Sequence, residues 1–324
     1  MNRRALLGAA FTSAAACAAG CSSARGAPLP KVTIAGGTPS GVYYQLGMAF
    51  AAEIRARWGI PAEVLTSNES IDNLRMVDQG HAHLGFATVD ICDVALQPDL
   101  PFTGILRIAA LAGVYEDYLQ LIVPADLPIV EISDLARFRV SLGAENSGTE
   151  FVAERLLHHA GVKQRPQRTY LTADDAAAEM LAGNLDAFFM MGGLPTLSVS
   201  RLAERMLARK RKVRLLSIPT GAESLRSRYK HLYVQRSIPA GTYGMDYEAS
   251  TIGVGNVIVI HKDASEDAAF RLTELLLAAQ PSLAKAHPEA RRLDQRTAVS
   301  TSSIPLHPGA LRYYRSTKPF PGKP

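Results

Sequence analysis

The residues of this sequence that could do chemistry are neutral hydrogen-bonding types gathered in five short segments. Each segment lies between an apolar run and a stretch with helical spacing, and none contains Lys or Arg. The segments are residues 36–44, 66–70, 87–90, 143–149 and 191–195. Backbone amides at a helix start carry a partial positive charge. The segments are therefore predicted to hold a small anion without a cationic side chain.

The candidate ligand-binding positions are hydroxyl, amide and glycine residues within these segments. They are Thr38, Ser40, Gly41, Ser67, Asn68, Thr88, Ser147, Gly148 and Thr149. Tyr43 and Tyr44 directly follow a Gly-rich turn, and we expect one of them to contact the ligand while the other packs in the core. The alternative is that these residues only cap helices and form turns. Ser147 fits both roles, because it has capping-box spacing to Glu150.

The acidic residues of the segments are Glu69, Asp90 and Glu145. Glu69 or Glu145 could hold an ammonium group, which would favour an amino acid over a plain diacid as the ligand. Nothing in the sequence brings these two glutamates together as a catalytic pair. A role at the surface or in ammonium binding is the simpler interpretation.

Signals for an enzyme, a cofactor or a metal site are weak. Residues 36–41 lack the Lys of a phosphate-binding loop. Ser147 has Glu145 two places before it, where a nucleophile elbow needs Gly. The histidines at 81–83 and 158–159 have no Cys or carboxylate at metal-ligand spacing. We predict a binding protein without catalytic residues, cofactor or metal; an exported hydrolase is a rival interpretation.

Short apolar runs alternate with helical stretches along the chain. The predicted strands are 31–35, 62–65, 83–87, 105–112, 119–123, 139–142, 186–190 and 251–260. Helical spacing recurs between them, for example at Leu46, Phe50 and Ile54. This alternation predicts an α/β fold with mostly parallel sheets flanked by helices, which bind ligands beyond the carboxyl ends of their strands. A length of 324 residues favours two domains.

The N-terminus has the features of an export signal. A positive start at residues 2–4 precedes an uncharged apolar run, 5–19, that is too short to span a membrane. Residues 18–21 (AAGC) resemble a lipoprotein cleavage box. The predicted parts are a signal peptide (1–20), a lipidated Cys21 inserted in the lipid bilayer, and a tether (21–30). An ordinary secretory signal is the alternative, and Sec and twin-arginine export both stay open. The protein is expected at the outer face of the cytoplasmic membrane or in the periplasm.

Charge gives little information about partners. The chain has 35 basic and 30 acidic residues, a formal charge of +5. The basic run from Arg201 to Arg214 is interpreted as a solvated helix end, with contact to anionic lipid or a partner as the alternative. Nucleic acid is not expected as a partner of an exported protein.

Several stretches, in this order and spacing, resemble the TAXI group of substrate-binding subunits of TRAP transporters. They are GGTPSGVYY (36–44), residues 143–149, GNLDAFF (183–189), YG (243–244), TIGV (251–254) and LHPGALRYY (306–314). The resemblance implies a type II periplasmic-binding-protein-like fold, with a small organic acid or amino acid in the cleft and transfer to TRAP permease membrane subunits. Family ligands are often dicarboxylates or glutamate-like amino acids. The binding positions it implies are Tyr43, Ser147, Thr149, Gly192, Gly193 and Pro195.

Two lobes joined by crossing strands follow from the same resemblance. We expect lobe I at 31–118 plus 251–315, lobe II at 119–250 and a Pro-rich tail at 316–324. Ligand contact with both lobes would stabilise a closed form. The family commonly has Thr-Gly-Gly-Ser where this chain has residues 66–70, so one wall of the pocket is expected to differ. A module presenting its ligand to a receptor kinase is the alternative to transport.

Overall fold

The computed structural model describes residues 28–160, 162 and 166–317. The predicted signal peptide and Cys21 lie outside these residues, together with the tether up to residue 27 and the tail from residue 318. Within the described residues, no helix has the length and apolar character needed to cross a membrane.

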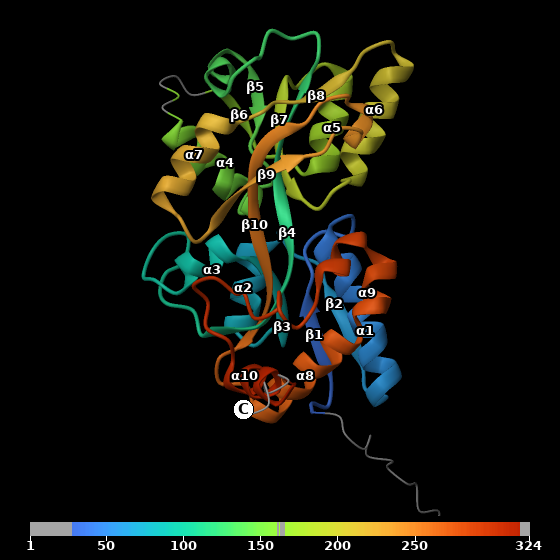
Figure 1. The fold of residues 1–324 in the computed structure, drawn as a ribbon, viewed down its shortest axis with the longest axis vertical. Helices are drawn as coiled ribbons and strands as arrows, with labels where there is room; N and C mark the ends of the chain where they lie inside the picture. The colour runs from blue at the N-terminus through green and yellow to red at the C-terminus, as the bar shows by residue number, and fades with distance from the viewer. Residues whose placement is uncertain (1–27, 161, 163–165, 318–324) are drawn as a thin grey trace, which may run out of the picture.

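One mixed sheet runs through the described part of the molecule and is flanked by helices (Figure 1). Its strand order is β2-β1-β3-β10-β4-β7-β5-β6, with β8 added to β4 and β9 added to β10. The strands are β1 (Val32–Ala35), β2 (Ala62–Leu65), β3 (Leu84–Thr88), β4 (Ile108–Pro124), β5 (Arg139–Ser141), β6 (Gln167–Thr169), β7 (Ala187–Gly192), β8 (Val213–Leu215), β9 (Tyr233–Ile238) and β10 (Ala249–His261).

The helices form two groups, termed the lower half and the upper half after their places in Figure 1, and β4 and β10 run through both. The lower half holds β1 to β3 with α1 (Val42–Trp58), α2 (Ser70–Asp78), α3 (Val89–Ala95), α8 (Glu266–Ala278), α9 (Gln280–Ala286) and α10 (Pro308–Thr317). The upper half holds β5 to β8 with α4 (Gly148–His159), α5 (Ala173–Ala182), α6 (Leu197–Ala208) and α7 (Pro219–Arg228). Short 3-10 helices are η1 (Ile132–Arg137), η2 (Thr242–Gly244) and η3 (Pro288–Arg292).

Each half contains three neighbouring parallel strands, as the alternation of strands and helices predicts. β1 pairs with β2 and β3 in the lower half, and β5 pairs with β6 and β7 in the upper half. The long strands β4 and β10 instead run antiparallel to each other and to β7 and β3. A parallel neighbour needs a long crossover, whereas β10 follows its antiparallel neighbour β9 after a short connection.

The expected strands 105–112 and 119–123 are a single strand, and the sequence prediction was wrong on this point. β4 spans Ile108–Pro124 and pairs with β10 from Ile108 to Tyr118. The acidic pair Glu116–Asp117 interrupts the apolar pattern, which is why two strands were predicted. Backbone pairing with β10 carries the strand across this pair. A charged side chain is thereby placed in the middle of the molecule.

Apolar residues predicted for the core are buried there. Leu46, Phe50 and Ile54 lie on one face of α1 and are at most 1% exposed, in a cluster with residues of β1, β3 and α8. Phe188 and Phe189 are buried as predicted, on opposite faces of β7. The helices are thus fixed against the sheet by ordinary apolar burial, and the connecting loops are left to form the walls of a site.

The basic run lies at the C-terminal end of α6 and in the turn to β8. Arg201 and Arg205 are exposed on α6. Arg211 pairs with Asp126 at 3.0 Å, and Arg214 donates to the backbone carbonyl of Ile129. Cations at a helix C-terminus interact favourably with its dipole. Exposure of Arg201 and Arg205 fits the solvated helix end that was expected, and the choice between that end and a lipid or partner contact stays a prediction.

The family-like stretch 306–314 forms the start of α10, which packs on α8 at the end of the molecule away from the upper half (Figure 1). A Cβ on Gly309 would lie 2.1 Å from the backbone oxygen of Glu266 and 2.9 Å from Ala269 Cβ. We expect Gly309→Ala to lower the free energy of unfolding by about 3 kcal/mol, which is the upper end of the typical cost of overpacking a core. Urea unfolding measures this loss. Gly104→Ala, where a Cβ meets nothing within 4 Å, is the matched control; equal midpoints for the two variants would contradict the packing argument.

Candidate ligand-binding site

A cavity of about 300 Å³ lies where loops of the lower half face loops of the upper half. Its lower wall comes from the turn after β1, the starts of α1 and α2, the end of β3 and residues 286–288. Its upper wall comes from the start of α4, the end of β7 and the loop into α6. Tyr115 and Asp117 of β4 complete it. Carboxyl ends of parallel strands meet here, the usual ligand site of open α/β sheets.

Most of the predicted ligand-binding residues line this cavity. They are Thr38, Ser40, Gly41, Tyr43, Thr88, Gly148, Thr149, Gly192, Gly193 and Pro195. Ser147 lines a smaller cavity of about 70 Å³. Ser67 and Asn68 line neither cavity in the described part of the chain. The Ser67 hydroxyl accepts from the Gly37 amide at 3.1 Å and donates to Asn73 Oδ1 at 2.6 Å. Ser67 therefore connects the turn after β1 to α2.

Two helix starts open onto the cavity without side-chain caps. Gly41 is the N-cap of α1 and Thr196 the N-cap of α6; neither caps its helix with a side chain, and neither helix has an acidic residue in its first turn. Both residues line the cavity together with Val42 and Leu197. The first amides of a helix lack intrahelical partners and carry partial positive charge. These two starts can therefore receive an anionic group such as a carboxylate.

The tyrosine expected to contact the ligand is Tyr43, which is 6% exposed and lines the cavity. Its ring stacks on Phe86 at 5.3 Å and meets Tyr115 edge-on at 6.2 Å. Its hydroxyl donates to Asn256 Oδ1 and lies 3.4 Å from Ser70 Oγ. Tyr43 thus belongs to both the core and the cavity wall, whereas Tyr44 is partly buried and lines neither cavity. Contact of Tyr43 with a ligand stays a prediction.

The start of α4 is built from Ser147 and Thr149. Ser147 caps the helix by accepting from the Glu150 amide at 3.2 Å. Glu150 reaches back one residue further than a capping box requires, to the Asn146 amide at 2.6 Å. Thr149 Oγ1 accepts from the Met191 amide at 3.1 Å and ties α4 to β7. Both hydroxyls already accept a structural hydrogen bond, so their substitution would also disturb the wall.

Two carboxyl groups belong to the cavity wall, and no Lys or Arg does among the described residues. Glu69 is partly buried at the N-cap of α2 with a left-handed φ of 68°. Burial raises the pKa of Glu69 to about 7. Burial, reinforced by the charges of Glu69 and Glu289, raises the pKa of Asp117 to about 8 despite hydrogen bonds from Asn256 and Tyr115. Both carboxyls therefore titrate within the physiological range.

The remaining acids singled out in the sequence lie elsewhere. Glu145 is exposed and lines neither cavity. Asp90 is fully buried in α3 and accepts at 2.8 Å from the Tyr233 hydroxyl of β9, which Arg155 of α4 also contacts at 2.9 Å. This group links α3 of the lower half to α4 of the upper half through β9. The histidine pairs form no metal site, and the described residues contain no group of His, Cys, Asp and Glu that could hold a metal ion.

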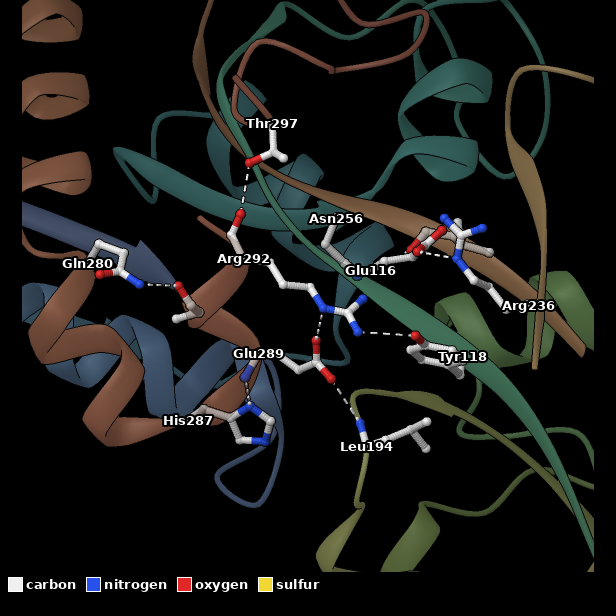
Figure 2. A network of polar contacts seen from close by, with 12 residues as sticks. Glu116, Tyr118, Leu194, Arg236, Asn256, Gln280, His287, Glu289, Arg292 and Thr297 are labelled. Atoms are coloured by element: carbon white, nitrogen blue, oxygen red, sulfur yellow. Dashed lines mark hydrogen bonds and ion pairs between the residues drawn. The ribbon is translucent and has the colours of Figure 1, made fainter. Parts of the chain in front are cut away.

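A polar network joins the two halves at the rim of the cavity (Figure 2). The Leu194 amide, in the loop between β7 and α6, donates to Glu289 Oε1 at 3.2 Å. Arg292 Nε lies 3.6 Å from Glu289 Oε2, and Arg292 also donates to the Tyr118 hydroxyl at 3.2 Å. Glu289 is 6% exposed, and a Cβ on Gly193 would lie 2.5 Å from its Cγ. The two halves are therefore in direct contact around the cavity.

Sequence reasoning missed several wall residues, among them Asp117, Tyr115, Thr196 and residues 286–288. Asp117 lies inside strand β4 and not in a loop at the end of a strand, where ligand-binding residues of α/β sheets are expected. An acidic pair within an apolar run was the signal that could have revealed it. Residues 286–288 follow α9 far along the chain, and no local pattern indicates that they return to this place.

Solved structures with a similar fold include a protein with a bound organic acid and a periplasmic binding protein. MatC from Rhodopseudomonas palustris, with bound malate, has a TM-score of 0.53 and 15% sequence identity over 81% of this chain and 89% of its own. The periplasmic aliphatic sulphonate binding protein SsuA from Escherichia coli has a TM-score of 0.50 and 16% identity over 90% of this chain and 84% of its own. At these identities the likeness establishes the fold, and it confirms the predicted periplasmic-binding-protein-like α/β architecture.

A family model supports the same relationship at the level of sequence. The model matches residues 34–317, from the first strand to the last helix and across every wall of the cavity. It does not separate the TAXI group from other members, so that finer assignment stays a prediction. With most of its length matched, this protein belongs to the NMT1-like family.

Proposed function

We propose that this protein is an exported solute-binding protein that captures a small organic acid or amino acid and delivers it to a TRAP-type membrane permease. One observation carries the proposal: a cavity of about 300 Å³ has walls from both halves of the molecule and is lined largely by hydroxyls, glycines and uncapped helix starts. This volume suits a small organic ligand. Two structural neighbours, an aliphatic sulphonate binding protein and a protein with bound malate, support a similar role.

The carboxylate of the ligand would lie at the starts of α1 and α6. Amides there have no side-chain cap and belong to opposite halves. A group held by both would bind the closed form better than an open one and would shift the population toward closure. The expected lobes, 31–118 plus 251–315 and 119–250, would then move about β4 and β10. No cofactor or metal takes part in this function.

The place of action follows from the N-terminus. The signal peptide and lipidated Cys21 would hold the mature protein on the outer face of the cytoplasmic membrane, close to a permease. Residues 21–30 would act as a flexible tether. We also propose membership of the TAXI group, on the stretches 36–44 and 306–314.

A thermal-shift screen of the mature protein against organic acids, amino acids and sugars tests capture. A ligand at about one hundred times its dissociation constant adds roughly 2.7 kcal/mol to the free energy of unfolding, which is a readily measured rise in Tm. Uptake of the labelled ligand in cells with and without the protein tests delivery. Absence of any stabilising ligand would contradict capture, and unchanged uptake would contradict the transport role.

A further inference from the structure

The cavity wall carries two carboxyl groups that no protein cation balances. Asp117 is 5% exposed, and its Oδ1 has no hydrogen-bond partner in the described part of the chain. Thr88 Oγ1, also in the wall and 2% exposed, has none either. Buried polar atoms in native proteins are normally hydrogen-bonded. A donor supplied by the ligand would satisfy them.

The groups around Asp117 are all acidic or neutral. Glu69 and Glu289 raise its pKa through their charges, and Tyr115 and Asn256 contact it as neutral donors. His287 also lines the cavity, and burial lowers its pKa, which favours the neutral imidazole. Arg292 lies beyond Glu289 and lines other surfaces of the molecule. Once these carboxyls are ionised, a dianionic ligand would meet uncompensated like charge here, which costs free energy in a low-dielectric site.

Helix starts add groups of the opposite polarity to the cavity. The uncapped starts of α1, in the lower wall, and of α6, in the upper wall, present amides to it. The cavity therefore offers both carboxyl groups, from β4 and the start of α2, and partly positive helix starts. A molecule that carries both an ammonium group and a carboxylate matches both kinds of group.

Resting on the proposed function, we propose that the ligand carries a protonated amine and has no net negative charge, with the amine bound by Asp117 and Glu69. Zwitterionic amino acids and organic amines belong to this class, and dicarboxylates do not. Asp117 and Glu69 are then the residues that decide specificity within the site.

The test compares matched pairs that differ only in the amine. Alanine with lactate, leucine with leucic acid, and phenylalanine with phenyllactate are titrated calorimetrically into the mature protein, with malate and succinate as dianions. We expect the amine member of at least one pair to bind at least about tenfold more tightly than its hydroxy acid, a difference of about 1.4 kcal/mol. The dianions should bind more weakly still.

The dependence of binding on pH gives a second measurement that needs no variant. The two carboxyls are largely protonated at pH 6 and ionised by pH 8.5, whereas the ammonium of an amino acid stays protonated across this range. Affinity for the amine should therefore rise between pH 6 and 8.5, and affinity for a hydroxy acid should fall. Opposite trends from one protein would exclude a general effect of pH on folding.

Variants locate the amine. Asp117→Asn and Glu69→Gln should each weaken binding of the amine about tenfold and flatten its pH profile. For hydroxy acids they should have little effect at pH 6 and should reduce the loss of affinity at pH 8.5. Glu116→Gln is the matched control, because Glu116 lies on the opposite face of β4, pairs with Arg236 at 2.7 Å and does not line the cavity. Circular dichroism checks that each variant is folded.

The outcomes separate this inference from the proposed function. Tight binding of a dianion or hydroxy acid that Asp117→Asn leaves unchanged or improves would overturn the inference, while solute binding itself would stand. If no compound of either class binds, both the inference and the proposed function are wrong.

Discussion

Gly193→Ala is expected to weaken ligand binding by roughly ten- to a hundredfold without unfolding the protein. The new Cβ would lie 2.5 Å from Glu289 Cγ, at the contact between the upper and lower halves. Glu289 cannot swing away freely, because it accepts from the Leu194 amide and lies beside Arg292. Overpacking of this kind typically costs about 1–3 kcal/mol. That cost falls on the closed form alone, so it lowers the apparent affinity for a ligand that needs closure.

A double-mutant cycle with Glu289→Ala tests this explanation by calorimetry on the best ligand of the screen. Removing the Glu289 side chain should weaken binding by itself, because one contact between the halves is lost. It also removes the clash, so Gly193→Ala should have little further effect in that background. Two outcomes would show that the rim contact does not control closure. One is a double variant whose loss of affinity equals the sum of the two single losses, and the other is unchanged affinity in either single variant.

Asp117→Asn is expected to stabilise the ligand-free protein at alkaline pH. The pKa of Asp117 is raised from 3.8 to about 8 in the folded state, so between these values the folded protein binds more protons than the unfolded chain. Stability therefore falls as pH rises through this window, and the asparagine variant escapes the loss. One pKa unit corresponds to about 1.4 kcal/mol. If half of the rise in the Asp117 pKa appears as lost stability, the variant is more stable than wild type by about 3 kcal/mol at pH 9. At pH 4 the two proteins should differ little.

Urea unfolding at pH 4, 6, 7.5 and 9 measures this difference. Glu116→Gln should follow the wild-type profile, because Glu116 pairs with Arg236 and its charge is compensated. Parallel profiles for wild type and Asp117→Asn would mean that the carboxyl is not held in an unfavourable environment. A buried, destabilising carboxyl in a cavity is the kind of strain that proteins retain for binding.

The loops that form the walls were predictable because they follow local rules. Gly-rich turns between an apolar run and a helical stretch must lie at strand ends, and parallel strands bring these ends to one edge of the sheet. This reasoning placed Thr38, Gly41, Thr88 and Thr149 at the cavity. It did not place Ser67, which lines neither cavity and whose hydroxyl bonds Gly37 and Asn73, because spacing along the chain does not fix the contacts of one side chain.

The sequence by itself determined the α/β architecture, the positions of the wall loops and the absence of cationic residues from them, since periodicity and turn chemistry are local properties. Only the tertiary structure decided the charge of the cavity. β4 continues through an acidic pair because β10 pairs with its backbone there, and this pairing turns Asp117 inward. Residues 286–288 and Glu289 reach the same place through packing of the C-terminal segment against β4. Contacts between segments so distant along the chain depend on the whole fold, and no short pattern encodes them.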